Sequence, residues 1–262
     1  LMQHKESFNE KVSLPTANGT PQLMKGKRGR VVMLIHGYKA SPREMLDIAK
    51  YLRKKNITCY LARMKGHGTS PFDMASTNHE DWVNYCKFSY HILQLTYETI
   101  DVCGFSTGGL IAMELARELP INKMILINVA LALHDIRFRF IKIAHLWSEI
   151  ATKFSKSHKK YILEESTYQD TNYNINHFHN INELSQLMKI VNSNASDIST
   201  RSMLIIYSNK DQVVNSEGSK KLFEKSTIRN KKIIEIDSTE HVITRGKEAE
   251  KIQPQIYDYL MQ

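Results

Sequence analysis

The 262-residue chain contains little cysteine and no long apolar run. Its three cysteines are Cys59, Cys86 and Cys103, an odd number without paired spacing, which argues against both a disulfide framework and a zinc site. No stretch reaches the roughly 18 apolar residues that a membrane-spanning helix needs. The first residues, Leu1 to Lys5, lack the apolar core of a signal peptide. We therefore expect a cytoplasmic protein, with a secreted or membrane-peripheral one as the alternative.

The chain also lacks internal repeats, low-complexity segments and any nucleic-acid recognition motif. It carries 36 basic and 27 acidic residues, a formal charge of +9. The basic residues form short clusters at 25–30, 53–55, 156–160 and 231–232. We interpret these clusters as solvated loops and helix ends, and we predict no nucleic-acid partner. The alternative is peripheral attraction to an anionic membrane surface or an acidic partner.

What the chain does contain is a regular alternation of strand-like and helix-like segments. Hydrophobic residues make up 42%, and the length fits one large α/β domain with an insertion. Strand-like apolar runs lie at 31–35, 57–62, 99–103, 123–129, 202–207 and 232–236. Helix-like segments lie at 42–55, 81–96, 109–119, 216–225 and 245–260. This alternation predicts a mostly parallel central sheet flanked by crossover helices.

The alternation stops between residues 130 and 200, a stretch without a strand-like run. Apolar residues recur there at helical spacing: Ile136, Phe140, Ile143, Trp147, Ile150 and Phe154. We predict a helical cap at 130–200, inserted between core segments 1–129 and 201–262. The stripe packs the cap on the core in one interpretation. In the other it lines an acyl-chain pocket, with Phe140 and Trp147 as substrate contacts, or docks on lipid.

The most informative motif is the Gly-x-Ser-x-Gly pentapeptide at residues 104–108. The apolar run 99–103 precedes it and a helix-like segment follows it, which is the context of a nucleophile elbow. In such an elbow the serine adopts a strained backbone, and a side chain at either glycine would collide with the neighbouring strand or helix. The motif predicts Ser106 as a nucleophile. The alternative is a glycine-rich turn with an incidental serine.

Two further residues follow late strands in the order that this arrangement requires. A serine needs a base to take its proton, and the base needs an acid partner. In the fold that carries a nucleophile elbow, the three follow in the chain order Ser, Asp or Glu, His. Asp211 comes just after the predicted strand 202–207, and His241 comes shortly after the predicted strand 232–236. Asp237 and Glu240 are rival acids, but both are too near His241 in sequence to arrive easily from a separate strand. We predict that Ser106, Asp211 and His241 form a catalytic triad.

An oxyanion hole needs two backbone N–H donors directed at the developing negative charge. The residue after the nucleophile, Thr107, should supply one. The loop after the early strand 31–35 should supply the other, and we predict Tyr38 in that loop as the donor.

Five pieces of the chain, in order, resemble the α/β-hydrolase superfamily. They are similar in particular to the carboxylesterase and monoacylglycerol lipase group. The pieces are Leu34–Tyr38, Gly66–Ser70, Gly104–Gly109, Asp211–Val214 and His241–Ile243. The resemblance implies an α/β-hydrolase fold, the triad and oxyanion donors given above, and a small helical cap. It also implies no cofactor, no metal and a structural rather than catalytic His67.

The function that follows is that of a serine carboxylester hydrolase. The expected partner is a small-molecule acyl ester as substrate. We expect this substrate to resemble a lipid, such as a monoacylglycerol. A serine at the elbow speaks against the branches that attack through a carboxylate. The cap at 130–200 matches no family pattern, so the substrate stays open. The alternatives are a lysophospholipase, an acyl thioesterase and a non-catalytic binding module, and the oligomeric state is not indicated.

Overall fold

The computed structural model describes residues 19–27, 29–134, 161–163, 172–173 and 175–262. The predicted apolar stripe at 136–154, including Phe140 and Trp147, lies outside the described residues, as does the basic cluster at 156–160.

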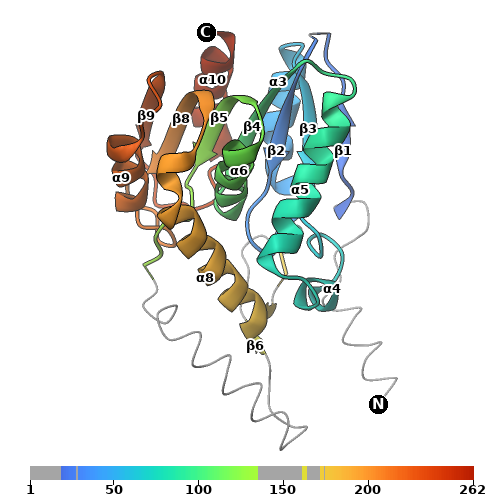
Figure 1. Cartoon of the computed structure of the whole chain (residues 1–262), viewed down its shortest axis with the longest axis vertical. Coiled ribbons are helices and arrows are strands. Elements are labelled where there is room, and N and C mark those ends of the chain that lie inside the picture. The colour runs from blue at the N-terminus through green and yellow to red at the C-terminus, as the bar shows by residue number, and fades with distance from the viewer. Residues whose placement is uncertain (1–18, 28, 135–160, 164–171, 174) are drawn as a thin grey trace, which may run out of the picture.

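Seven strands form the central sheet, in the order β1-β3-β2-β4-β5-β8-β9 (Figure 1). Their bounds are β1 (Gln22–Met24), β2 (Arg30–Ile35), β3 (Thr58–Ala62), β4 (Thr99–Phe105), β5 (Ile121–Ile127), β8 (Thr200–Ser208) and β9 (Lys231–Ile236). Only β1 runs antiparallel to its neighbour; the other pairs of this sheet are parallel. The predicted mostly parallel sheet is therefore confirmed.

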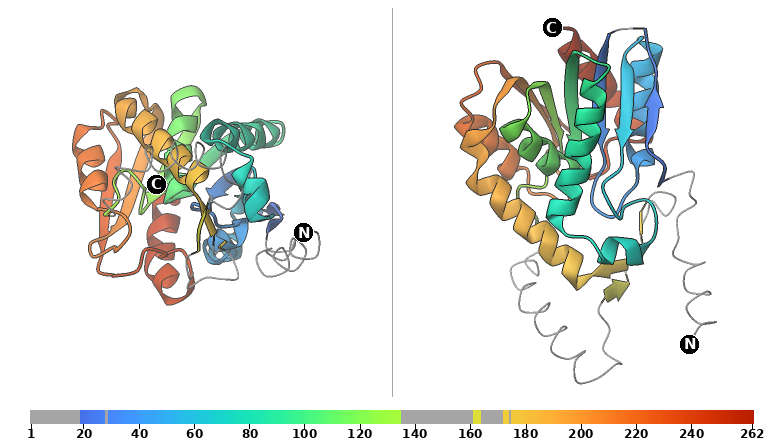
Figure 2. Two further views of the ribbon diagram at one scale, coloured as in Figure 1. Left: turned by 90° about the horizontal axis from the view of Figure 1, so that it is seen from below. Right: turned by 45° about the vertical axis from the view of Figure 1, so that its right-hand side comes forward.

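Helices cover both faces of the sheet, as the view from below in Figure 2 shows. One face carries α3 (Leu46–Lys54) and α10 (Gly246–Met261). The other carries α5 (His79–Gln94), α6 (Thr107–Glu118), α8 (Phe178–Ser193) and α9 (Glu217–Lys225). Three shorter helical turns are η1 (Pro42–Met45), α4 (Pro71–Ala75) and η3 (Ala195–Asp197).

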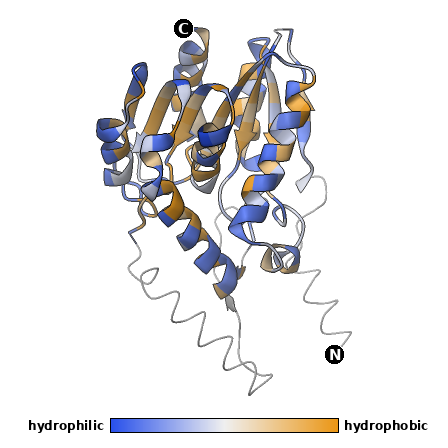
Figure 3. Cartoon of the chain, viewed as in Figure 1, coloured by the Kyte–Doolittle hydropathy of each residue, from blue (hydrophilic) through white to orange (hydrophobic). Residues whose placement is uncertain are grey.

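The residues of β2 show why a continuous apolar run becomes a central strand. Side chains alternate between the two faces of a strand. Val31, Met33 and Ile35 therefore enter the core under α5 and α6, whereas Val32 and Leu34 enter the core under α3 and α10. All five are fully buried, as expected for a parallel sheet covered on both faces. Figure 3 shows the apolar strands between helices of mixed polarity.

The structure corrects the prediction that residues 130–200 contain no strand. Two three-residue strands, β6 (Tyr161–Leu163) and β7 (Ile175–His177), pair antiparallel in a separate ribbon. The edge strand β1 was not predicted either. Segments of three residues are too short to show a period of two, so only their pairing with another segment defines them.

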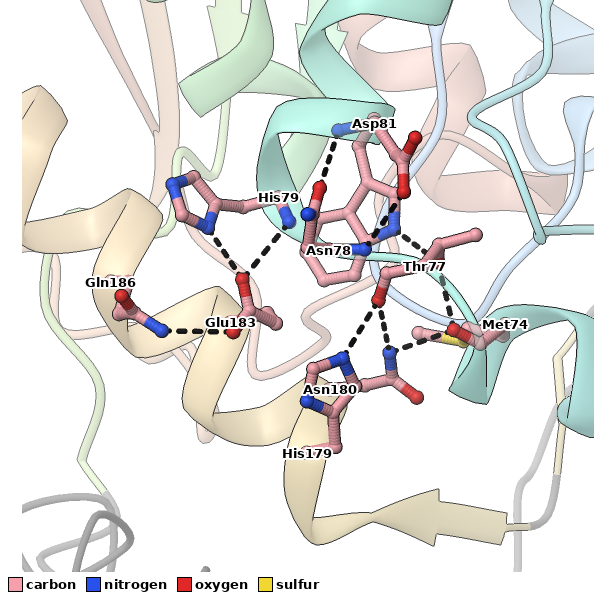
Figure 4. A network of polar contacts seen from close by, with 10 residues as sticks. Met74, Thr77, Asn78, His79, Asp81, His179, Asn180, Glu183 and Gln186 are labelled. Atoms are coloured by element: carbon pink, nitrogen blue, oxygen red, sulfur yellow. Dashed lines mark hydrogen bonds and ion pairs between the residues drawn. The ribbon is translucent and has the colours of Figure 1, made fainter.

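Helix α8 is the longest described element between residues 130 and 200, and it is tied to the core near its N-terminus (Figure 4). Glu183 accepts hydrogen bonds from the backbone N–H of His79 at 3.2 Å and from its ring Nδ1 at 2.6 Å. Asn180 donates to the carbonyls of Met74 and Thr77, at 2.8 and 3.1 Å. These bonds hold α8 against the start of α5 and the end of α4.

A buried charge cluster lies at the edge of the sheet where the parallel strands begin. Asp101 of β4 is fully buried and accepts hydrogen bonds from Arg30 of β2, at 2.9 Å to its Nε, and from Asn122 of β5, at 2.7 Å. Arg30 also donates to the carbonyl of Leu260 at 2.6 Å. The cluster thereby joins three strands to the end of α10.

We predict that Asp101→Leu lowers the free energy of unfolding by about 3–5 kcal/mol, because it leaves Arg30 uncompensated. The double variant Arg30→Met, Asp101→Leu should recover most of this loss, since both charges are then replaced by apolar groups. Urea unfolding measures both effects. As a control, Glu217→Ala removes an exposed ion pair with Lys220 and should change the free energy by less than about 1 kcal/mol. Equal losses in the single and double variants would contradict this account.

Candidate active site

Ser106 lies in a strained turn between β4 and α6. Its backbone has φ 52° and ψ −117°, in the left-handed half of conformational space that non-glycine residues rarely adopt. A Cβ added at Gly104 would lie 2.1 Å from the carbonyl oxygen of Gly108, and one at Gly108 would lie 2.2 Å from that of Ile35. Both positions therefore need glycine, and the strand, sharp turn and helix have the geometry that the motif predicts.

His241 lies between the side chains of Ser106 and Asp211. Its Nε2 is 3.1 Å from Ser106 Oγ, and its Nδ1 is 2.7 Å from Asp211 Oδ2. Because a carboxylate only accepts hydrogen bonds, Nδ1 carries the proton in this contact and the Nε2 lone pair faces the serine hydroxyl. The structure thus brings together the three residues that the sequence singles out. A base in this orientation can remove the serine proton.

Asp211 occupies a tight turn just past the end of β8. Its Oδ1 accepts hydrogen bonds from the backbone N–H groups of Val213 and Val214, at 2.7 and 2.9 Å. The other carboxylate oxygen is therefore directed to His241. The rival acids lie elsewhere: Asp237 forms an exposed ion pair with Lys210 at 2.7 Å, and Glu240 is exposed.

Thr107 and Tyr38 follow neighbouring parallel strands. Ile35 at the end of β2 pairs with Gly104 near the end of β4, so both segments leave the sheet side by side. The close approach of Gly108 to the carbonyl of Ile35 brings the first turn of α6 against the loop that carries Tyr38. The first N–H groups of a helix have no partner within it and attract negative charge. This edge of the sheet can therefore stabilise an anion beside Ser106.

Sequence reasoning missed a buried carboxyl group, that of Glu44, which contacts the loop after β2. Glu44 is 1% exposed, and its Oε2 accepts a hydrogen bond from the backbone N–H of Gly37 at 2.7 Å. Burial raises the pKa of Glu44 to about 7, although the Gly37 bond and the charge of Arg245 act in the opposite direction. In the sequence Glu44 looks like any acidic residue in a first helical turn, so no local signal distinguishes it.

Two buried histidines connect the loop after β2 to the Gly-His-Gly loop at residues 66–68. His36 donates from Nδ1 to the carbonyl of Gly37 at 2.9 Å, and its Nε2 accepts from the backbone N–H of Met64 at 3.3 Å. The ring of His67 packs edge-on against Trp82. Burial lowers the pKa of His36 to about 3 and that of His67 to about 4, so both are neutral at pH 7.

Among the residues that the structure describes, no group of three His, Cys, Asp or Glu side chains could hold a metal ion. No helix in the same ranges is long and apolar enough to cross a membrane. Cys59, Cys86 and Cys103 are buried and unpaired with one another, and burial raises the pKa of Cys59 and Cys86 to about 12.

Residues 26–248 match the protein family described as "Serine aminopeptidase, S33". A carboxylesterase of Bacillus subtilis (strain 168) is 23% identical over 246 residues, which span 92% of this chain and 96% of that protein. A thermostable monoacylglycerol lipase of Bacillus sp. (strain H-257) is 38% identical over 89 residues, or 34% of this chain and 36% of that protein.

Two solved structures resemble the fold of this chain closely. A metagenome-derived lipolytic enzyme superposes with a TM-score of 0.79 at 20% identity, covering 95% of this chain and 99% of its own. The monoacylglycerol lipase of Paleococcus ferrophilus superposes with a TM-score of 0.75 at 17% identity, covering 92% of this chain and 97% of its own. At these identities the likeness concerns the fold.

The buried Glu44 predicts a pH dependence of stability. Its folded-state pKa of about 7 lies above the ordinary value of 4.5, so the folded protein holds this proton more tightly than the unfolded chain does. The resulting stabilisation is complete below pH 4.5 and is lost as the pH rises towards 7. Relative to Glu44→Gln, the wild type should therefore lose up to about 3 kcal/mol of unfolding free energy across this interval.

Urea unfolding of both proteins at several pH values measures this difference. Glu183→Gln, which alters a carboxyl group in the α8 contact instead, serves as the control for the general effect of removing a carboxylate. A constant difference between wild type and Glu44→Gln from pH 4.5 to 7 would show that the Glu44 pKa is not raised.

Proposed function

The chain belongs to the Serine aminopeptidase, S33 family of α/β-hydrolases, and on that basis we propose that it is a serine hydrolase of carboxylic acyl esters. The observation that carries the proposal is the pair of contacts made by His241, at 3.1 Å to Ser106 Oγ and at 2.7 Å to Asp211 Oδ2. These are the distances that nucleophilic catalysis by a base-activated serine requires.

In the proposed mechanism the Ser106 oxygen attacks the acyl carbonyl carbon while His241 Nε2 takes the serine proton. Asp211 holds the ring in the tautomer that can accept this proton, and it stabilises the imidazolium that forms. The backbone N–H groups of Tyr38 and Thr107 stabilise the negatively charged oxygen of the tetrahedral intermediate. His241 then returns the proton to the leaving alcohol. Water attacks the acyl-enzyme by the same path and releases the acid.

For the substrate we propose a lipid-like acyl ester of the monoacylglycerol kind. The support comes from the relatives, because a carboxylesterase matches almost the whole chain and a monoacylglycerol lipase matches a third of it. We also propose that residues 130–200 form a cap, of which α8 is one described part. Helix α8 contacts α4, α5 and α6, and α6 is the helix that begins directly after Ser106.

The described basic clusters do not favour an orientation in which a membrane faces the site. Arg30 begins β2, Lys231 begins β9, and the cluster 53–55 lies at the end of α3, next to the start of β3. All three positions are at the edge where parallel strands begin, whereas Ser106 follows the end of β4. An anionic surface bound through these clusters would therefore lie at the end of the sheet away from Ser106.

A fluorophosphonate probe tests the nucleophile. The wild-type protein should be labelled, Ser106→Ala should not, and the variant should lose at least about a thousandfold in ester hydrolysis. Ser89→Ala is the matched control, because Ser89 is buried in α5, where its hydroxyl donates to the carbonyl of Tyr85 and contacts Tyr60 rather than the elbow. Equal labelling of the wild type and Ser106→Ala, or none of the wild type, would contradict the mechanism.

A substrate panel tests the acyl preference. We expect kcat/KM to rise from p-nitrophenyl acetate to p-nitrophenyl laurate and to be measurable for a long-chain monoacylglycerol, because each buried CH₂ contributes about 0.8 kcal/mol. Hydrolysis of an amino-acid p-nitroanilide, which has an amide bond in place of the ester bond, would indicate an aminopeptidase rather than an ester hydrolase. Preference for acetate would contradict the lipid-like substrate, and preference for the anilide would contradict ester hydrolysis.

A further inference from the structure

The last residue of β5 and the segment that follows it contact the backbone N–H and the carbonyl of Ser106. The N–H of Ser106 donates to the carbonyl of Ile127 at 2.9 Å, and the carbonyl of Ser106 accepts from the N–H of Ala130 at 3.3 Å. The segment 127–130 therefore defines where the strained serine backbone lies, without contributing a side chain to the reaction itself.

Asn128, in the middle of that segment, reaches a different part of the site. It is 2% exposed, and its amide Nδ2 donates to the backbone carbonyl of His241 at 2.7 Å and to Ser208 Oγ at 3.1 Å. Its Oδ1 accepts from the backbone N–H of Ser208 at 2.7 Å. Both amide protons and the amide oxygen of Asn128 are thus engaged.

Ser208, the last residue of β8, extends this contact by one residue. It is fully buried, and its Oγ donates to the carbonyl of Glu240 at 3.1 Å. Asn128 and Ser208 together therefore hold two consecutive carbonyls of the loop that carries His241. The side chains of Asp237 and Glu240 in that loop are exposed, whereas these two carbonyls are held from the buried side of the loop.

We propose that Asn128 is a positioning residue that places His241 relative to Ser106; this inference rests on the function proposed above. One short segment holds the serine through its backbone and the histidine loop through the Asn128 amide. The separation of His241 Nε2 and Ser106 Oγ, 3.1 Å, then follows from a common anchor. A displacement of about 1 Å between reacting groups can cost about 100-fold in rate, so this anchor matters for catalysis.

Asn128 could matter only for its own backbone conformation, and the variants must distinguish this role from the positioning of His241. Its backbone has φ 40°, a conformation in which asparagine, aspartate and glycine are favoured. Asn128→Gly keeps this conformation and removes the amide. Asn128→Asp keeps the shape of the side chain and puts an acceptor where the His241 carbonyl needs a donor. Asn56→Gly is the matched control, since Asn56 also has positive φ, at 63°, and lies in the exposed turn between α3 and β3.

The experiment measures kcat and KM on a p-nitrophenyl ester and the rate of fluorophosphonate inactivation, all corrected for the folded fraction from urea unfolding. We expect Asn128→Gly and Asn128→Asp to lose about 10- to 100-fold in kcat and in inactivation rate, with KM nearly unchanged. Asn56→Gly should match the wild type. Wild-type kcat in both Asn128 variants, or a loss explained by the unfolded fraction alone, would overturn the proposal.

A readout that does not depend on turnover separates this inference from the proposed function. The His241 Nδ1 proton bonded to Asp211 should give a downfield proton NMR signal, assigned by its absence in His241→Ala. We expect this signal to broaden or shift in both Asn128 variants and to persist in Asn56→Gly. An unchanged signal would overturn positioning by Asn128. A wild type without hydrolysis or labelling would overturn the function, and the NMR comparison would still decide the role of Asn128.

Discussion

The close approach of the first turn of α6 to the ends of β2 and β4 is the constraint on which the site depends. Two glycines permit it, because a Cβ at Gly104 or Gly108 would lie within about 2 Å of a backbone oxygen. The same approach forces Ser106 into its strained conformation at the edge of the sheet. It also brings the N-terminus of a helix, the end that attracts negative charge, beside the loop after β2.

Buried polar groups around this turn hold the loops that the strands alone would leave free. Glu44 accepts the N–H of Gly37, neutral His36 connects Gly37 to Met64, and Asn128 donates to the carbonyl of His241. Each replaces water that the backbone groups lose on burial, and an unmatched group there would cost about 1–3 kcal/mol. The loops around Ser106 are therefore held by buried side chains other than those of Ser106, Asp211 and His241.

The sequence was informative where a candidate site residue comes shortly after a strand. The runs before Ser106 and Asp211 become β4 and β8, and the run before His241 becomes β9, so their order and spacing indicated that they could meet. Glu44 and Asn128 were missed because nothing local distinguishes them. Glu44 resembles a solvated helix residue, and Asn128 lies inside the predicted strand 123–129. Only the partners across the fold reveal their contacts.

By itself, the sequence determined the parallel sheet and the chain positions of the three residues that meet at His241. Apolar runs and glycines act locally, through side-chain burial and backbone sterics, and these are readable from neighbouring residues. The tertiary structure alone decided the short strands β1, β6 and β7, the raised pKa of Glu44 and the common anchor of Ser106 and His241. Those features arise from pairing and desolvation between segments far apart in the chain, for which no local pattern exists.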